Sequence, residues 1–348
     1  MRPSAKRLVA GSVVVALLAI PALAGAVSGL AGPLFGLTTA RHGTLLVADA
    51  SVGILTVKED QVHSTIPLPG VTDVSPAGNN LLWAVTGAGA SPQADTGQAL
   101  YRIWKGEPRL IVNLFEFETA NNPDGHDPFD SNPYDVQALS SQAALVVDAG
   151  GNDLLKVNKN GRVRVLAVFP DEEVSTANFK QLAGCPNPPD PEPAPPCDMP
   201  DTAMAQAVPT SVTIGPDGYY YVGELKGFPG PTGESNIWRI SPWASWAQCP
   251  SRHCVKVFDG GFTSIIDLAF HRGRLYVAEL DEASWAAVEI FQSGVGGTIS
   301  SCNVRRLTCR VVAEGIPQLT AITFDRHGNL WATRNSLVPG GAEVVKVD

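Results

Sequence analysis

Acidic residues recur at matching positions of a repeated pattern, and they are the side chains of this sequence best suited to chemistry. Two polar columns appear when six copies of the pattern are aligned. The first column contains Gly36, Asp73, Asp135, Ser211, Asp267 and Ala321, and the second contains Asp49, Thr86, Asp148, Glu224, Glu279 and Arg334. Because Asp is disfavoured in strands, a strand pattern alone does not require so many acids.

The two columns suggest a hard-cation site, most simply for Ca²⁺, which takes several oxygen ligands from carboxylates, carbonyls and amides. The candidate ligands are Asp73, Asp135, Asp148, Glu224, Asp267 and Glu279, with amide oxygens from Asn132 and Asn152. Alternatively, each acid accepts hydrogen bonds from backbone N–H groups and pins a loop, because charge-assisted bonds of that kind are strong. A catalytic carboxylate is a third alternative, and the sequence does not decide among the three.

Other signals of catalysis are sparse. No G-x-S-x-G nucleophile elbow, phosphate-binding loop or dinucleotide glycine pattern occurs. His126 is a candidate general base, whereas Asp124, Asp127 and Asp130 form a second acidic cluster that lacks the spacing and the glutamate of an EF-hand. We therefore expect a binding protein more than an enzyme, with unknown catalytic residues and no cofactor other than Ca²⁺.

The acids are positioned by a strand–turn–strand unit that recurs six times. The copies are Gly36–Asp49, Asp73–Thr86, Asp135–Asp148, Ser211–Glu224, Asp267–Glu279 and Ala321–Arg334. Hairpins that recur at a period of several tens of residues are typical of a propeller, because a single hairpin cannot bury its apolar faces alone. We predict an all-β fold, a six-bladed β-propeller of four-stranded antiparallel blades over residues 27–348.

The last blade offers only one further strand before the sequence ends. Ring closure in propellers often borrows a strand from the other terminus, and Gly29–Phe35 is the candidate here. Its Gly and Pro content makes it a poor strand, so a three-stranded last blade is the alternative.

Long connections are expected on one end of the propeller, which we call the long-loop face. They are Thr86–Gln98, Glu116–Asn132, Pro170–Ala207, Lys226–Ser235 and Asp281–Gly297. Elaborate loops on one face of a rigid scaffold usually carry recognition. We therefore expect a small molecule or a protein to bind at this face and at the channel mouth, and we expect a monomer.

The first 26 residues read as a secretory signal peptide. A positive start with Arg2, Lys6 and Arg7 precedes a short apolar run and two small-residue cleavage sites, Ala22-Leu23-Ala24 and Ala24-Gly25-Ala26. An uncleaved N-terminal anchor is the alternative. Removing the segment takes the formal net charge from −9 to −12. Such acidity argues against nucleic-acid binding, which depends on Lys and Arg.

Six cysteines fall in three close pairs, which predicts local disulfides in an exported protein. The pairs are Cys185/Cys197, Cys249/Cys254 and Cys302/Cys309. The first pair brackets a Pro-rich stretch within an insert at residues 171–207. Neither strand nor helix is expected in that Pro-rich stretch itself. We predict a secreted, extracytoplasmic protein.

Several motifs resemble the ScyD/ScyE family, secreted β-propellers named for their association with scytonemin biosynthesis. They are NPYDV (Asn132–Val136), VVDAGGNDLLKV (Val146–Val157), VLAVFP (Val165–Pro170), VPTSVTIGPDGYYYVGELKGFPG (Val208–Gly230) and GFTSIIDLAF (Gly261–Phe270). The family is similar to NHL and SMP-30-like propellers, some of which hold Ca²⁺ in the channel and act as lactonases. The resemblance thus implies a second function, a Ca²⁺-dependent hydrolase or lactonase, or an accessory enzyme of secondary-metabolite biosynthesis. It implies no particular catalytic residue.

Overall fold

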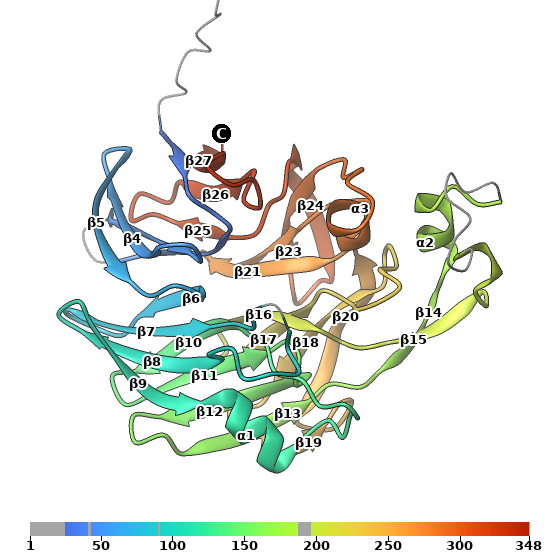
Figure 1. Cartoon of the computed structure of the whole chain (residues 1–348), viewed down its shortest axis with the longest axis horizontal. Coiled ribbons are helices and arrows are strands. Elements are labelled where there is room, and N and C mark those ends of the chain that lie inside the picture. Colours follow the sequence, from blue (N-terminus) through green and yellow to red (C-terminus); the bar gives the residue numbers. More distant parts are fainter. Residues whose placement is uncertain (1–24, 41–42, 90, 187–195, 348) are drawn as a thin grey trace, which may run out of the picture.

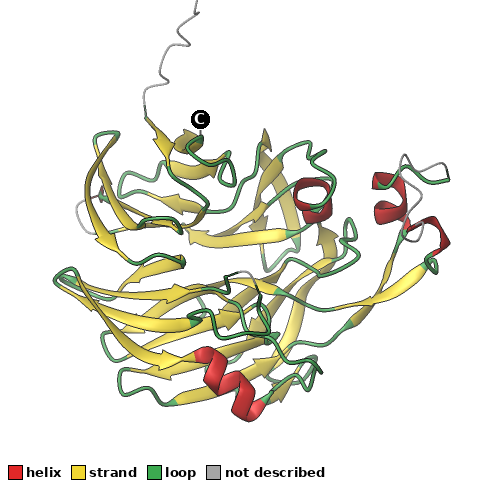
Figure 2. Cartoon of the chain, viewed as in Figure 1, coloured by secondary structure: helices red, strands yellow, loops and turns green. Residues whose placement is uncertain are grey.

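The computed structural model describes residues 25–40, 43–89, 91–186 and 196–347 and forms a six-bladed β-propeller (Figures 1 and 2). The predicted signal peptide therefore lies almost wholly outside the described residues. Among the described residues, no helix is long and apolar enough to cross a membrane. The predicted fold class is confirmed.

Each blade has four antiparallel strands that follow one another from the axis outward. Blades 1 to 3 are β2–β5 (Leu34–Thr39, Leu45–Asp49, Gly53–Lys58, Gln61–Pro67), β6–β9 (Val71–Pro76, Leu81–Thr86, Ala99–Trp104, Glu107–Asn113) and β10–β13 (Pro133–Ser140, Ala143–Asp148, Asp153–Asn158, Val163–Val168). Blades 4 and 5 are β16, β17, β18 and β20 (Pro209–Ile214, Tyr220–Glu224, Ser235–Ile240, Cys254–Phe262) and β21–β24 (Ile265–His271, Arg274–Glu279, Gly297–Asn303, Thr308–Ile316).

Blade 6 joins the two ends of the chain. Its strands are β25 (Ile322–Phe324), β26 (Leu330–Arg334), β27 (Ala342–Val347) and, outermost, β1 (Ala26–Leu30). Closure by the N-terminal segment is confirmed, but the strand is Ala26–Leu30 rather than Gly29–Phe35, and a three-stranded last blade is wrong. Gly29 has a φ of +74° and lies where the register of β1 shifts, between Val27 and Leu30. Gly32, with a φ of +63°, turns the chain between β1 and β2.

Apolar faces of neighbouring blades pack against each other and form the core. In one such cluster, Val85 and Leu100 of blade 2 pack with Val136 and Val146 of blade 3. The α1 helix (Leu114–Asn121) joins blades 2 and 3, and Leu114 is buried in the same cluster. The two-residue strand β19 (Ala247–Gln248) pairs in parallel with β13 and covers the outer edge of blade 3.

The insert contains more regular structure than its proline content predicts. Strands β14 (Glu172–Ser175) and β15 (Thr202–Ala205) form a separate hairpin, which carries α2 (Ala177–Leu182) and the 3₁₀ turn η2 (Pro196–Asp198). In Figure 1 this arm stands apart from the six sheets. The prolines are concentrated between these two flanks. The expectation of neither strand nor helix concerns that Pro-rich stretch, which lies outside the described residues except for Pro196, the first residue of η2.

All three predicted disulfides are present. Cα separations are 5.5 Å for Cys185–Cys197, 5.3 Å for Cys249–Cys254 and 4.1 Å for Cys302–Cys309. The third pair connects β23 and β24, the two outermost strands of blade 5. The second lies in the β18–β20 connection, where it joins Cys249, next to β19, to Cys254 at the start of β20, so it does not connect two outer strands of blade 4 as a hairpin disulfide would. The first closes the arm.

Candidate functional site

The innermost strands of the blades surround a cavity of about 310 Å³ on the propeller axis. Asp73 of β6, Asp135 of β10 and Asp267 of β21 line it, and we call these three acids the channel ring. The cavity continues along the inner strands to His271 and Asp325. The repeat alignment therefore placed these three acids at one site.

Each acid of the channel ring bonds to the inner strand of the next blade. Oδ2 accepts the backbone N–H of the residue that follows the aligned position there: Asp73 from Val136 at 3.1 Å, Asp135 from Val212 at 2.6 Å and Asp267 from Ile322 at 2.7 Å. The ring acids thus connect neighbouring blades.

Threonines that lie one residue before the aligned position also form hydrogen bonds between neighbouring blades, as donors to backbone carbonyls. Each donates its hydroxyl to a carbonyl of the next inner strand: Thr72 to Pro133 at 3.0 Å, Thr210 to Ile265 at 2.6 Å and Thr320 to Leu34 at 2.6 Å. Blade 1 has Gly36 at the aligned position, where a Cβ would lie 2.2 Å from Asp73 Oδ1. The Asp73 carboxyl therefore fills the space that a side chain of blade 1 would need.

Burial and mutual repulsion raise the pKa values of the channel ring. Burial is the largest cause for all three acids, and the charge of Asp135 further raises the pKa of Asp73 and of Asp267 well above the usual range. A hydrogen bond between the Asp73 and Asp135 carboxyls raises the pKa of Asp73 and opposes the rise for Asp135. The raised pKa values favour the protonated form of these carboxyls, and a protonated carboxyl is a requirement for general acid chemistry.

Acids at the ends of the second strands hold nearby loops. Asp148 accepts four hydrogen bonds, from the Ser131 hydroxyl at 2.6 Å and from the N–H groups of Asn132, Gly150 and Gly151 at 2.5, 3.1 and 3.1 Å. Asp49 and Glu279 do the same on a smaller scale. Asp49 accepts from the Gly32 and Ser51 N–H groups at 3.0 and 3.1 Å, and Glu279 from the Thr263 N–H at 2.6 Å.

The two predicted amide ligands also lie in the loops of the long-loop face. The Asn132 Oδ1 accepts the Ala88 N–H at 2.8 Å, and the Asn152 Oδ1 accepts the Val208 N–H at 2.9 Å. The Asn152 amide nitrogen donates to Asp124 Oδ2 at 2.9 Å. Their side-chain oxygens therefore already accept hydrogen bonds from the backbone of neighbouring loops.

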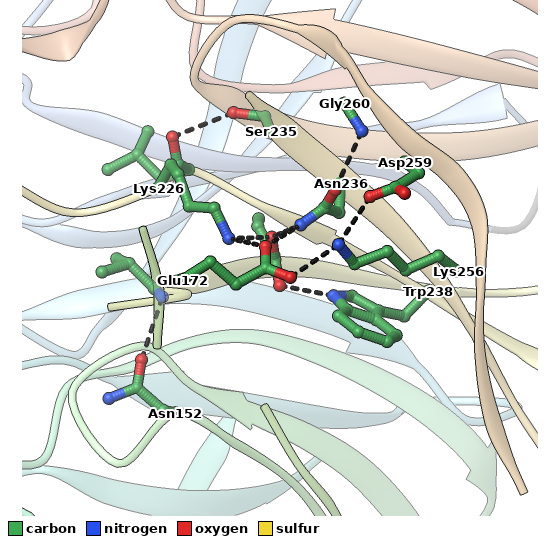
Figure 3. Close-up of polar contacts among 12 residues, drawn as sticks. Asn152, Glu172, Lys226, Ser235, Asn236, Trp238, Lys256, Asp259 and Gly260 are labelled. Atoms are coloured by element: carbon green, nitrogen blue, oxygen red, sulfur yellow. Dashed lines mark hydrogen bonds and ion pairs between the residues drawn. The ribbon is translucent and has the colours of Figure 1, made fainter. Parts of the chain in front are cut away.

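Glu224 belongs to a buried charge network at the base of the arm. Figure 3 labels its partners Lys226, Asn236 and Trp238 and the neighbouring Glu172. The Lys226 ammonium lies 3.0 Å from Glu224 and 2.6 Å from Glu172 of β14, and Lys226 and Glu224 are almost completely buried. The indole N–H of Trp238 and the amide of Asn236 also donate to Glu224. Burial raises the pKa of Glu224, and Lys226 opposes that rise.

The predicted metal ligands are thus distributed over several places. Asp73, Asp135 and Asp267 share the axial cavity. Of the others, Asp148, Asn132 and Asn152 lie together at blade 3, whereas Glu224 ends β17 of blade 4 and Glu279 ends β22 of blade 5. Within the parts of the chain that the structure describes, no three His, Cys, Asp or Glu side chains are already arranged to hold a metal ion.

The long-loop face carries two adjoining depressions, of about 470 Å³ and about 180 Å³, that share Val208, Leu225 and Glu289. The larger depression is walled by Met204, Gln206, Gly227, Phe228 and Trp285, and the smaller reaches Phe35 and Tyr134. The Phe35 and Tyr134 rings meet edge to face at 5.8 Å, and both residues also line the axial cavity. This aromatic pair therefore lies between the long-loop face and the channel ring.

The arm contributes to the wall of these depressions and is docked on the loops beside them. Phe179 of α2 packs edge to face against Phe228 and Phe291, with ring centroids 5.0 and 5.2 Å apart. The Asn178 amide donates to the Gly230 carbonyl at 2.8 Å and to the Ser284 hydroxyl at 3.0 Å.

Sequence reasoning missed the aromatic and apolar residues of these depressions. Trp285, Phe228 and Met204 come from three different long connections, so no spacing in the sequence relates them.

His126, the candidate general base, lies between Asp124 at 2.9 Å and Asp171 at 3.2 Å.

No protein-family model matches this chain, and neither does any curated protein. Solved structures match it in fold. An aldose sugar dehydrogenase of Escherichia coli is 12% identical with a TM-score of 0.53, covering 92% of this chain and 97% of its own. A gluconolactonase of Xanthomonas campestris is 13% identical with a TM-score of 0.52, covering 92% and 88%. A Bacteroides thetaiotaomicron protein of unknown function is 11% identical with a TM-score of 0.55, covering 93% and 75%. At such identities the likeness concerns the propeller fold alone.

Proposed function

We propose that this protein is a secreted β-propeller of the ScyD/ScyE kind that binds a small-molecule or protein ligand at its long-loop face, without catalysis. The observation that carries the proposal is the pair of adjoining depressions beside the arm. Secretion accords with the three disulfides, which persist in oxidising compartments.

The lining of the depressions indicates the chemistry of the ligand. Met204 and Phe228 expose 61% and 51% of their surface, which is costly unless something covers them. Glu289 supplies the polar group where the depressions meet. A ligand with an aromatic or apolar body and a hydrogen-bond donor or cation fits this combination, since recognition sites are mostly apolar with a few placed polar groups.

A thermal-shift screen with small phenols, indoles and aromatic amines tests this proposal. Compounds that bind should raise the melting temperature of wild type, and Phe228→Asp should weaken their binding at least tenfold. Trp243→Ser is the matched control, because Trp243 is 85% exposed but lies in the β18–β20 connection at the opposite end of blade 4. Binding that survives Phe228→Asp and Met204→Asp would place the ligand elsewhere. A pull-down with the same variants tests a protein ligand.

A second candidate function is a Ca²⁺-dependent hydrolase of the lactonase kind, with the channel ring as its catalytic acids. The raised pKa values of the ring acids beside a cavity of about 310 Å³ favour it. Hydrolysis of D-glucono-1,5-lactone, followed with CaCl2 and with EDTA, tests it. Turnover that requires Ca²⁺ and is lost in Asp135→Asn would support the enzyme; no turnover above background in either buffer would exclude this substrate.

A further inference from the structure

Five carboxylates gather beside α1, away from the propeller axis. They are Glu118 of α1, Asp124 and Asp130 of the segment that follows it, Asp148 at the end of β11 and Asp153 at the start of β12. We call them the α1 cluster. Leu114 fixes α1 against blade 3 by packing into the cluster of buried residues that contains Val146 and Leu155.

The backbone forces the acids of the α1 cluster together. Asp148 and Asp153 are direct cross-strand partners in the antiparallel β11–β12 pair, a position in which like charges repel. The turn between them includes Gly151, where an added Cβ would lie 3.0 Å from Glu118 Oε2 and 3.5 Å from Asp148 Cγ. Glu118 therefore lies directly over the turn that joins the two aspartates.

Several oxygens of the α1 cluster have no hydrogen-bond partner among the described residues. Both carboxylate oxygens of Asp153, which is 0% exposed, are in this state, as are Glu118 Oε1 and Asp130 Oδ1. Glu118 is 1% exposed. Buried polar atoms are nearly always paired, so orphaned carboxylate oxygens at this density indicate a missing partner.

The basic side chain that contacts an acid of the α1 cluster among the described residues is a histidine. His126 pairs with Asp124 and with Asp171, and no Lys or Arg among the described residues forms an ion pair with any of the five acids. Burial and the neighbouring charges raise the pKa of Glu118 to about 9 and that of Asp130 to about 6, and they raise the pKa of Asp153 well above its usual range. No acid of the α1 cluster thus has a buried ammonium partner among the described residues, such as the one that Lys226 provides for Glu224.

We propose that the α1 cluster is a Ca²⁺ site, with Asp153 and Glu118 as its central ligands and Asp124 and Asp130 closing it from the loop. The available ligand atoms are all carboxylate oxygens, which suit a hard cation. The ligands come from two strands, a helix and a loop, and this variety suits the flexible shell of six to eight ligands around Ca²⁺. Asp148, whose oxygens already accept four hydrogen bonds, acts mainly by adding charge.

The carboxylates are not gathered around one point. Mutual repulsion keeps uncompensated carboxylates apart, and a divalent cation removes that repulsion. Ca²⁺ binding should therefore draw α1 and the loop carrying Asp124 and Asp130 onto blade 3. This site differs from the one expected at the channel ring in both its residues and its place.

Isothermal titration of the EDTA-treated, dialysed full chain with CaCl2 tests the proposal, together with melting curves in CaCl2 and in EDTA. Wild type should bind one Ca²⁺ and melt at a higher temperature with it. Glu118→Gln and Asp153→Asn should each weaken Ca²⁺ binding at least tenfold. In EDTA they should melt at or above the wild-type temperature, because each replaces a buried carboxyl that must either hold a proton or carry an uncompensated charge. A residue with a merely structural role would lower that temperature instead.

Asp281→Asn is the matched control, because Asp281 is a 1% exposed acid of blade 5 that already accepts the Ala283 and Gly296 N–H groups, so the variant should leave Ca²⁺ binding unchanged. Wild type that binds no Ca²⁺ would overturn the proposal. So would Ca²⁺ binding that is lost in Asp135→Asn but kept in both cluster variants, since the ion would then lie on the axis. If the two buried variants do not fold, Asp130→Asn at the half-buried edge of the cluster provides the same test.

Discussion

The channel ring and the α1 cluster are both groups of closely spaced acids that are buried or partly buried, yet they differ in what faces the carboxylates. In the channel ring each Oδ2 accepts a backbone N–H from the next blade, and the acids face a polar cavity. In the α1 cluster Asp153 has no hydrogen-bond donor among the described residues, and Glu118 lacks one for Oε1. Acid type and burial are therefore poor guides to metal binding, and the count of donors aimed at each oxygen is a better one.

Glu224 provides the reference for this comparison. It is as buried as Glu118 and Asp153 of the α1 cluster, but Lys226, Asn236 and Trp238 all donate to it. A buried acid in this fold is thus compensated by a side-chain cation, by backbone N–H groups or, as we propose for the α1 cluster, by a bound ion.

The largest effect is expected when the cation beside Glu224 is removed. Lys226→Met leaves Glu224 and Glu172 without their shared ammonium, and breaking a buried pair in this way costs about 3–5 kcal/mol of unfolding free energy. Urea unfolding measures the loss. Lys256→Met is the control: Lys256 also contacts Glu172, at 2.6 Å, but is partly exposed, so its loss should cost at most about 1 kcal/mol. Equal losses would mean that burial of Lys226 is not what matters.

The pH dependence of stability should separate the α1 cluster from the rest of the protein. The pKa of Glu118 is raised to about 9 in the folded chain from a usual value of 4.5, so the folded state binds the extra proton between these pH values. Stability contributed by that proton is present below pH 4.5 and is lost as the pH rises toward 9, by at most about 1.4 kcal/mol per pH unit.

Urea unfolding of wild type in EDTA between pH 5.5 and 8.5 measures this slope. Glu118→Gln should flatten the decline with rising pH, because the amide carries no titrating proton. Saturating CaCl2 should flatten it in wild type, because the ion replaces the proton. A slope that is the same in both proteins and both buffers would contradict the uncompensated state of the α1 cluster.

The fold was predicted well from the sequence because each blade has a local sequence pattern of its own. Alternating apolar residues and short turns define the first two strands, and the aligned acids then share one axis because equivalent residues of inner strands converge there. The closing strand was misplaced by a few residues, since β1 tolerates Gly29 at a positive φ, the chain turns at Gly32, and no apolar pattern indicates where the ring closes.

The partners of the acids were much harder to predict than the acids themselves. Glu118 was read as part of a long loop, and only a short Asn-capped helix brings it over the Asp148–Asp153 pair. Lys226 meets Glu172 across 54 residues and Asp135 meets Val212 across 77. Such contacts depend on which loops and blades become neighbours, and no single-sequence pattern carries that information.

Truncation of a channel-ring acid should have a moderate effect. Asp267→Ala leaves the Ile322 N–H without its acceptor, which should cost about 1–3 kcal/mol. Asp267→Asn keeps an acceptor oxygen and should stay within about 1 kcal/mol of wild type. Urea unfolding of the two variants compares them. If Asp267→Ala stabilised the protein, the carboxylates of the channel ring would be as uncompensated as those of the α1 cluster. The proposed difference between the two groups of acids would then not exist.

The smallest effect is expected at the threonines that complete the connection between blades. Thr210→Val removes one hydroxyl that donates to the Ile265 carbonyl at 2.6 Å while keeping the shape of the side chain, so it should cost about 0.5–1.5 kcal/mol. The neighbouring Ser211 is the control, because its buried hydroxyl has no partner among the described residues and Ser211→Ala should be neutral or slightly stabilising. Urea unfolding of the pair, one residue apart on β16, isolates a single bond between blades 4 and 5. If Ser211→Ala cost as much as Thr210→Val, the losses would reflect general packing of the inner strand, and blade-to-blade hydrogen bonds would not explain how the ring around the channel acids is held.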